Sequence, residues 1–89
     1  MNLDDAIYNW LSIKLVAEAR EDDLAAKDTY DFFSDILSEE HLVEEIEATK
    51  DDLWYIVDYI IDGEKLQKQY PSKLIEALLL QIESEPKYN

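Results

Sequence analysis

His41 and Glu45 are the residues of this chain whose types and spacing come nearest to a metal site. Four residues apart on a helix, an imidazole and a carboxylate lie on neighbouring turns, and both bind divalent metals. Two ligands are too few to hold a metal without others. The two side chains also lie on the same side of a helix only if residues 42–61 are helical. We therefore expect a solvent-facing histidine near a helix end, and we predict no metal site and no cofactor.

Other catalytic chemistry lacks its usual residues. The chain has no cysteine and one glycine, so it offers no thiolate, no cysteine-based zinc site and no glycine-rich phosphate cradle. Acidic residues number 22, so carboxylate pairs of the kind that glycosidases use carry no information here. The segments "DDLAAKD" and "DGEK" lack the alternating ligands of a calcium loop. We predict that the protein is not an enzyme and has no catalytic residues.

Acidic charge is the most unusual feature of the composition, since 89 residues carry a net charge of −14. The excess lies mainly in residues 1–48, which hold 14 acidic and 3 basic side chains. Such a surface repels phosphate backbones and anionic lipids, so we predict no direct nucleic-acid binding and no membrane binding. It attracts basic protein surfaces over a Debye length of about 8 Å, although solubility alone also accounts for it.

Length and composition indicate one small domain. With one glycine and two prolines, no flexible linker divides the chain, and we predict a domain over residues 1–85 and a frayed tail at 86–89. No apolar run reaches the roughly 18 residues of a membrane span. The acidic start "MNLDDAIYNW" is unlike a signal peptide. We therefore expect a cytoplasmic protein.

Two helices are predicted in the first 40 residues. Apolar residues recur at helical spacing after a cap at Asn2 or Asp4 and up to about Arg20, and a second helix begins after Asp22 or Asp23. Because few residues join them, the two helices should form an antiparallel pair. Their predicted apolar faces consist of Leu3, Ala6, Ile7, Trp10, Ile13 and Ala17 in the first helix, and of Ala25, Thr29, Phe32, Phe33 and Ile36 in the second.

The segment "LWYIVDYIIDGEKLQKQYP", residues 53–71, predicts a β-hairpin. Asp62 and Gly63 suit a two-residue turn in which both residues take positive φ. Such a turn determines the register and sets Tyr59 opposite Leu66. The aromatic and β-branched residues that crowd this segment suit a pleated surface.

A second turn, predicted at Asp51-Asp52, adds a third strand and sets Ile46 opposite Val57. The two registers agree on which side chains share a face. The predicted core face holds Ile46, Ala48, Tyr55, Val57, Tyr59, Leu66 and Tyr70. The other face holds Glu47, Thr49, Trp54, Ile56, Asp58, Ile60, Lys65, Gln67 and Gln69.

A last helix, "KLIEALLLQIESE", is predicted after Pro71 and a cap at Ser72. Apolar side chains surround most of it, so we expect it to be largely buried. The predicted order is α-α-β-β-β-α. The fold class is α+β, with a helical hairpin and a C-terminal helix packed on a three-stranded antiparallel meander.

An all-α four-helix bundle is the alternative fold. A heptad seam connects Leu42, Ile46, Thr49, Leu53, Ile56 and Ile60. Ser38 would cap that helix and Gly63 would end it. Against it, the aromatic and β-branched residues between positions 54 and 61 lose rotamer freedom in a helix.

Trp54, Ile56 and Ile60 form an apolar stripe along the middle of the otherwise polar sheet face. Such a stripe commonly marks an interface, unless the last helix covers it. We predict a small acidic, non-catalytic protein that self-associates or binds a protein partner through this stripe.

The acidic N-terminal half suggests an alternative function. Its carboxylates would imitate a nucleic-acid backbone and block a basic partner, as inhibitor and immunity-type proteins do. The residues of this predicted acidic surface are Glu21, Asp22, Asp23, Asp28, Asp31, Asp35, Glu39, Glu40, Glu44, Glu45 and Glu47.

Overall fold

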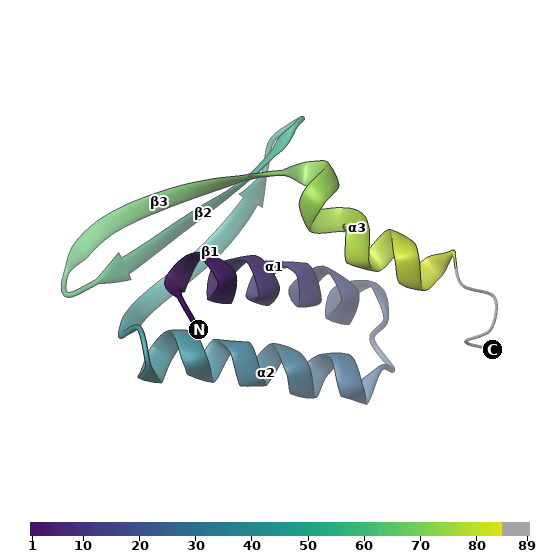
Figure 1. Ribbon diagram of the computed structural model, residues 1–89, viewed down its shortest axis with the longest axis horizontal. Helices are drawn as coiled ribbons and strands as arrows, with labels where there is room; N and C mark the ends of the chain where they lie inside the picture. Colours follow the sequence, from purple (N-terminus) through teal and green to yellow (C-terminus); the bar gives the residue numbers. More distant parts are fainter. Residues whose placement is uncertain (85–89) are drawn as a thin grey trace.

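The computed structural model describes residues 1–84, which form three helices and one three-stranded antiparallel sheet (Figure 1). The predicted α+β fold and its element order are confirmed, and the all-α alternative is wrong because residues 43–61 supply two strands of the sheet. The tail predicted at 86–89 lies outside the described residues. The elements are α1 Leu3–Ala19, α2 Leu24–Glu39, β1 Val43–Lys50, β2 Trp54–Ile61, β3 Glu64–Pro71 and α3 Ser72–Glu83.

Helix α1 lies in the centre of the molecule, between α2 and the sheet, and α3 runs beside it (Figure 1). Asn2 caps it by accepting a hydrogen bond from the backbone N–H of Asp5. Because α1 has neighbours on several sides, its buried residues extend beyond one stripe. Leu11 and Val16 are buried in addition to the predicted Ala6, Ile7 and Trp10.

The buried face of α2 agrees only in part with the predicted one, because Ile36 is buried and Phe33 half-buried as predicted, but other residues of that face are not. Ala26 and Leu37 are buried, and Tyr30 packs with its ring centroid 6.0 Å from that of Trp10. Apolar residues occur in adjacent pairs along this helix, so the periodicity alone left two faces about 100° apart. Contact with α1 favours Ala26 over Ala25 and Phe33 over Phe32, whereas Ile36 and Leu37 are both buried. Of the predicted face, Ala25, Thr29 and Phe32 are exposed.

The hairpin of β2 and β3 has the predicted register, with Asp62 at φ 54°, Gly63 at φ 75° and Tyr59 opposite Leu66. The turn between β1 and β2 was predicted wrongly. The Asp51 N–H donates to the Trp54 carbonyl at 2.8 Å, so the turn residues are Asp52 and Leu53.

The error in that turn moves the pairing of β1 by two residues, so that Ile46 lies opposite Tyr59 instead of Val57. Side chains alternate between faces with a period of two, so an even shift leaves each one on its predicted face. The predicted core face is therefore correct. Tyr55, Val57 and Tyr59 are buried, and Ile46, Ala48, Leu66 and Tyr70 pack against them.

A β-bulge at Glu44 adapts the start of β1 to the core. Val43 lies opposite Ile61 and Glu45 opposite Ile60, so Glu44 is the extra residue. Its Oε1 accepts a hydrogen bond from the Gly63 N–H at 3.2 Å. Because one extra residue reverses the alternation, Val43 turns inward and is buried in the core.

Helix α3 is not largely buried, contrary to the prediction. Only Ser72 and Ile75 are buried, whereas Leu74, Leu78 and Leu80 are exposed. The helix leaves the end of β3 and lies beside α1 instead of turning over the sheet (Figure 1). Within residues 1–84, no helix lies over the sheet face that is turned away from α1.

Candidate functional site

The sheet face turned away from α1 is the candidate site, and we call it the outer face. Strand alternation and the observed pairing bring together the polar and apolar residues that were predicted for it, with Glu45 added. They form rows across β1, β2 and β3. The rows are Glu45, Ile60 and Lys65; Glu47, Asp58 and Gln67; and Thr49, Ile56 and Gln69.

The apolar stripe runs along β2 on this face. Trp54 is 42% exposed, although it is one of the largest apolar side chains of the chain. Ile56 and Ile60 are half-buried. Asp58 interrupts the stripe between them, and its Oδ1 accepts a hydrogen bond from Gln67 Nε2 at 2.9 Å. The stripe is thus an apolar strip with one carboxylate in it.

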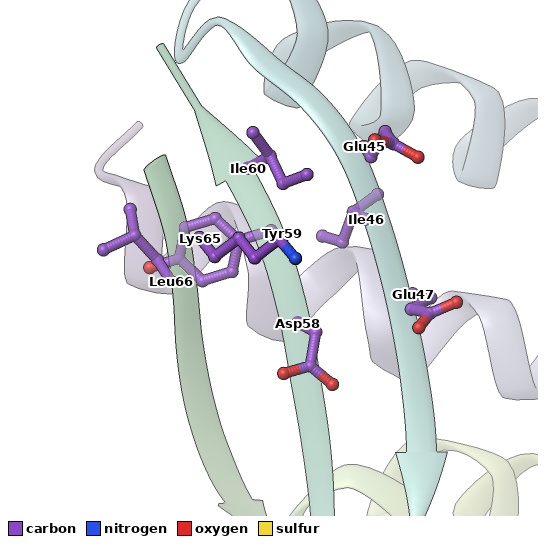
Figure 2. A pocket seen from close by; sticks show the side chains of 8 residues that line it. All are labelled: Glu45, Ile46, Glu47, Asp58, Tyr59, Ile60, Lys65 and Leu66. Atoms are coloured by element: carbon purple, nitrogen blue, oxygen red, sulfur yellow. The ribbon is translucent and has the colours of Figure 1, made fainter. Parts of the chain in front are cut away.

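A hollow of about 360 Å³ lies on the outer face around Ile60 (Figure 2). Glu45, Glu47, Asp58 and Lys65 surround it. Within residues 1–84, neither of the two glutamates nor the lysine has an ion-pair partner within 4.0 Å. The remaining lining residues are Ile46, Tyr59 and Leu66, whose side chains belong to the core face. The hollow combines an apolar floor with three carboxylates and one ammonium group.

The apolar surface extends past the end of the stripe. Leu53 is exposed, and its carbonyl accepts a hydrogen bond from the Ser72 N–H at 2.9 Å, so it lies beside the start of α3. Leu74, two residues into α3, is exposed as well. Sequence reasoning missed both residues, because it gave Leu53 no surface role and expected α3 to be buried. The signal was present in α3, which carries more leucine than one buried stripe needs.

A polar cluster joins α3 to the sheet. The Glu76 carboxylate accepts hydrogen bonds from Lys50 Nζ and from the Tyr55 hydroxyl, both at 2.8 Å. The bond from Lys50 and then that from Tyr55 hold the pKa of Glu76 below its usual value. Burial, reinforced by the bond to Glu76, raises the pKa of Tyr55 to about 12. All three groups stabilise each other, so the cluster has a structural role.

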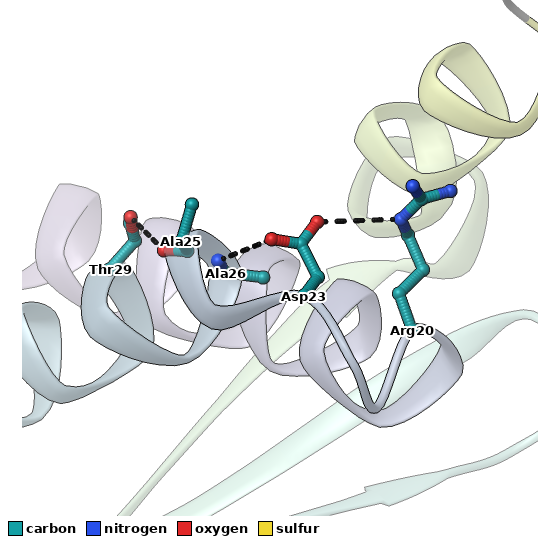
Figure 3. A network of polar contacts seen from close by, with 5 residues as sticks. All are labelled: Arg20, Asp23, Ala25, Ala26 and Thr29. Carbon is teal, nitrogen blue, oxygen red and sulfur yellow. Dashed lines mark hydrogen bonds and ion pairs between the residues drawn. The ribbon is translucent and has the colours of Figure 1, made fainter. Parts of the chain in front are cut away.

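The predicted acidic surface is divided among several places. Asp23 caps α2, because its Oδ1 accepts from the Ala26 N–H at 3.0 Å and its Oδ2 lies 3.4 Å from Arg20 Nε (Figure 3). Glu21 and Asp22 are exposed before that cap, and Glu40 is exposed after the helix. Asp23 and Glu44 therefore bind their own chain, whereas Glu45 and Glu47 belong to the outer face.

The remaining four predicted acids form a stripe along α2, which we call the acidic stripe. Spacings of three, four and four residues put them on one side of the helix, and all are exposed. They are Asp28, Asp31, Asp35 and Glu39. The tertiary structure places this stripe and the outer face on different surfaces, although the sequence presents their residues as one acidic half.

His41 lies between α2 and β1, so it does not share a helix with Glu45. Its Nε2 is 2.9 Å from the Met1 carbonyl oxygen. Within the described residues, no group of three or more histidine, aspartate or glutamate side chains could hold a metal ion.

No protein-family model, curated protein or solved structure matches this chain. None of the helices in residues 1–84 combines the length and the hydrophobicity that a bilayer crossing requires. The fold and the site together define a small acidic α+β protein with an apolar strip on a sheet face that no helix of residues 1–84 covers.

Proposed function

We propose that this protein is a non-catalytic protein-binding protein whose contact surface is the outer face. The observation that carries the proposal is the 42% exposure of Trp54, in line with Ile56 and Ile60 on a face that no helix of residues 1–84 covers. Trp is enriched at interfaces because it combines a large apolar area with one hydrogen-bond donor.

The surroundings of the stripe support a contact with protein. Protein interfaces combine an apolar centre with a polar rim. On the outer face, Ile56 and Ile60 occupy the middle strand, while Glu45, Glu47 and Lys65 occupy the two edge strands. Such an arrangement excludes water at the centre and leaves the charged groups at the margin, where they select the partner.

Trp54→Asp tests the proposal, and Phe32→Asp is the matched control. Both residues are exposed aromatics, at 42% and 58%, but Phe32 lies on α2. Each variant is checked by circular dichroism, then compared with the unchanged chain for oligomeric state and for proteins captured from a cell extract. We expect Trp54→Asp to abolish an association that Phe32→Asp retains. If Trp54→Asp keeps the fold and loses neither oligomer nor partner, the outer face is not the contact surface.

The acidic stripe favours a second candidate function, the imitation of a nucleic-acid backbone. Its four carboxylates span about 17 Å of helix, a mean separation of about 5.5 Å, at the helical rise of 1.5 Å per residue. One strand of DNA carries a phosphate every 3.4 Å or so along its axis. The stripe is therefore a less dense line of charge that would block a basic nucleic-acid-binding protein.

The salt dependence of partner binding separates the two candidates. A complex made by the acidic stripe should weaken steeply as salt rises, and changing Asp28, Asp31, Asp35 and Glu39 to their amides should abolish it. A complex made by the stripe on β2 should depend on Trp54 and weaken little. Salt-insensitive binding would exclude the second candidate.

The absence of catalysis and a cytoplasmic location remain part of the proposal. A carboxylate enzyme that uses a divalent cation would release or absorb heat on titration with magnesium, calcium or manganese. We expect no such heat. A measurable heat with any of the three ions would contradict the non-catalytic assignment.

A further inference from the structure

We propose that the outer face binds a second copy of this chain, related by a two-fold axis roughly parallel to β2. The inference rests on the proposed function, since it names the occupant of the same surface. Facing sheets pack about 10 Å apart, with strand directions within about 30° of each other. When two copies pack outer face to outer face, the two-fold axis that relates them therefore runs either along the strands or across them.

An axis along the strands keeps every row at its own height. It stacks β2 on β2 of the second copy, and β1 on β3 of the second copy. Trp54, Ile56 and Ile60 then each meet the same residue of the other chain. The apolar strip, which has no cover within residues 1–84, becomes the centre of the interface.

The charges of the edge strands fit this axis. Glu45 and Lys65 belong to one row, so Glu45 of each copy meets Lys65 of the other, and symmetry makes this pair twice. Both side chains lack an ion-pair partner within residues 1–84. In the next row, the Glu47 carboxylate meets the Gln67 amide of the second copy, which supplies N–H donors.

An axis across the strands fits the charges poorly. It would stack β1 on β1 of the second copy and so collect the carboxylates of Glu45 and Glu47 from both chains along one edge. Like charges that face each other across an interface are unfavourable. The charge pattern therefore selects the axis along β2.

Two features limit the strength of this dimer. Asp58 of one copy meets Asp58 of the other, a repulsion that the hydrogen bond from Gln67 to each carboxylate only partly offsets. Each chain also carries a net charge of −14, so the copies repel each other until salt screens them. The dimer should therefore tighten as salt rises, opposite to a complex with a basic partner.

The size of the face also indicates a weak dimer. Three strands at about 4.8 Å spacing and eight residues at about 3.3 Å rise give a footprint of about 14 by 26 Å. That footprint, about 380 Å², is smaller than the roughly 800 Å² that each partner buries in a standard interface. We expect reversible dimers with dissociation constants above about 1 µM.

Sedimentation of the full chain from about 1 µM to about 1 mM, at low and high salt, tests the inference. The dimer fraction should rise with concentration and with salt. Lys65→Glu should weaken the dimer about tenfold, because two attractive pairs become repulsive. The double variant Glu45→Lys, Lys65→Glu should restore it at unchanged net charge, and Asp58→Asn should tighten it several-fold. Lys27→Glu, with the same charge change as Lys65→Glu on exposed α2, is the control.

Each contrary outcome overturns the inference. A chain that stays monomeric over the whole concentration range at high salt forms no such dimer. The proposed function is then tested by whether Trp54→Asp loses a partner protein that the unchanged chain captures. If Trp54→Asp breaks a dimer that the double variant Glu45→Lys, Lys65→Glu does not form, that dimer uses the outer face, but its two copies are not related by the axis along β2. A dimer that neither Trp54→Asp nor Lys65→Glu weakens uses another surface.

Discussion

Ile75→Ala tests the position of α3, on which the uncovered outer face depends. Ile75 is fully buried, with 0% exposure, and is the main apolar anchor of the helix. The substitution removes three carbons, worth about 2.4 kcal/mol at roughly 0.8 kcal/mol per buried methylene. The cavity left behind adds to this, and buried Ile→Ala changes cost about 2–5 kcal/mol. We expect the free energy of unfolding to fall by about 3 kcal/mol.

Urea denaturation followed by circular dichroism measures this loss, and thermal melting checks it. For a chain of this size, 3 kcal/mol corresponds to a melting temperature lower by roughly 12–24 °C. An unchanged dependence on urea would indicate cooperative unfolding of the whole domain, whereas a smaller slope would indicate that α3 has already detached.

Leu80→Ala is the matched control, since Leu80 is 60% exposed on the other side of the same helix and should cost no more than about 1 kcal/mol. If Ile75→Ala also costs less than about 1 kcal/mol, Ile75 does not anchor α3 and the helix is free to lie elsewhere. Equal losses in both variants would mean that α3 is buried on both sides. Either result would contradict the inference that Ile75 holds α3 beside α1 and so keeps it off the outer face.

Three further predictions concern stability. Ser12 Oγ is buried and has no hydrogen-bond partner within residues 1–84, so Ser12→Ala should raise the free energy of unfolding by about 1 kcal/mol in urea titrations; a loss of stability would contradict this. Hydrogen bonds from Lys50 and Tyr55 lower the pKa of Glu76 below 4.5. The stability that the ionised Glu76 gives the fold is therefore present above pH 4.5 and is lost as the pH falls through the pKa of Glu76 in the folded protein. Melting temperature against pH should show this loss, and Glu76→Gln should remove it. Burial raises the pKa of Tyr55 from 10.0 to about 12, so stability should fall as pH rises through that interval, by at most about 3 kcal/mol; if Tyr55→Phe leaves the alkaline loss unchanged, Tyr55 is not its cause.

The division of the sheet into two faces was predictable from local chemistry. Asp62 and Gly63 both accept positive φ, so they determine the hairpin and hence the side to which Tyr55, Val57 and Tyr59 point. The wrongly predicted turn at Asp51-Asp52 left every side chain on its predicted face, because it shifted the strand pairing by two residues and side chains alternate with a period of two.

The packing of the helices was predicted less well. On α2, apolar residues come in adjacent pairs, and only packing against α1, where Tyr30 meets Trp10, decides that Ala26 and Tyr30 face inward while Phe32 remains exposed. The bulge at Glu44, which turns Val43 into the core, also has no local signature. Its position depends on where β1 meets the hairpin turn, through the bond from Gly63 to Glu44.

The sequence by itself determined the charge, the elements and the face on which Trp54, Ile56 and Ile60 lie, because these depend on residue type and on the alternation of strands. Only the tertiary structure decided that no helix between residues 1 and 84 covers this face. Its leucines suggested that α3 would be buried, but a chain of 89 residues leaves a large share of its apolar surface in contact with water. Ile75 docks beside α1, and the cover that α3 could have given the outer face is therefore absent within residues 1–84.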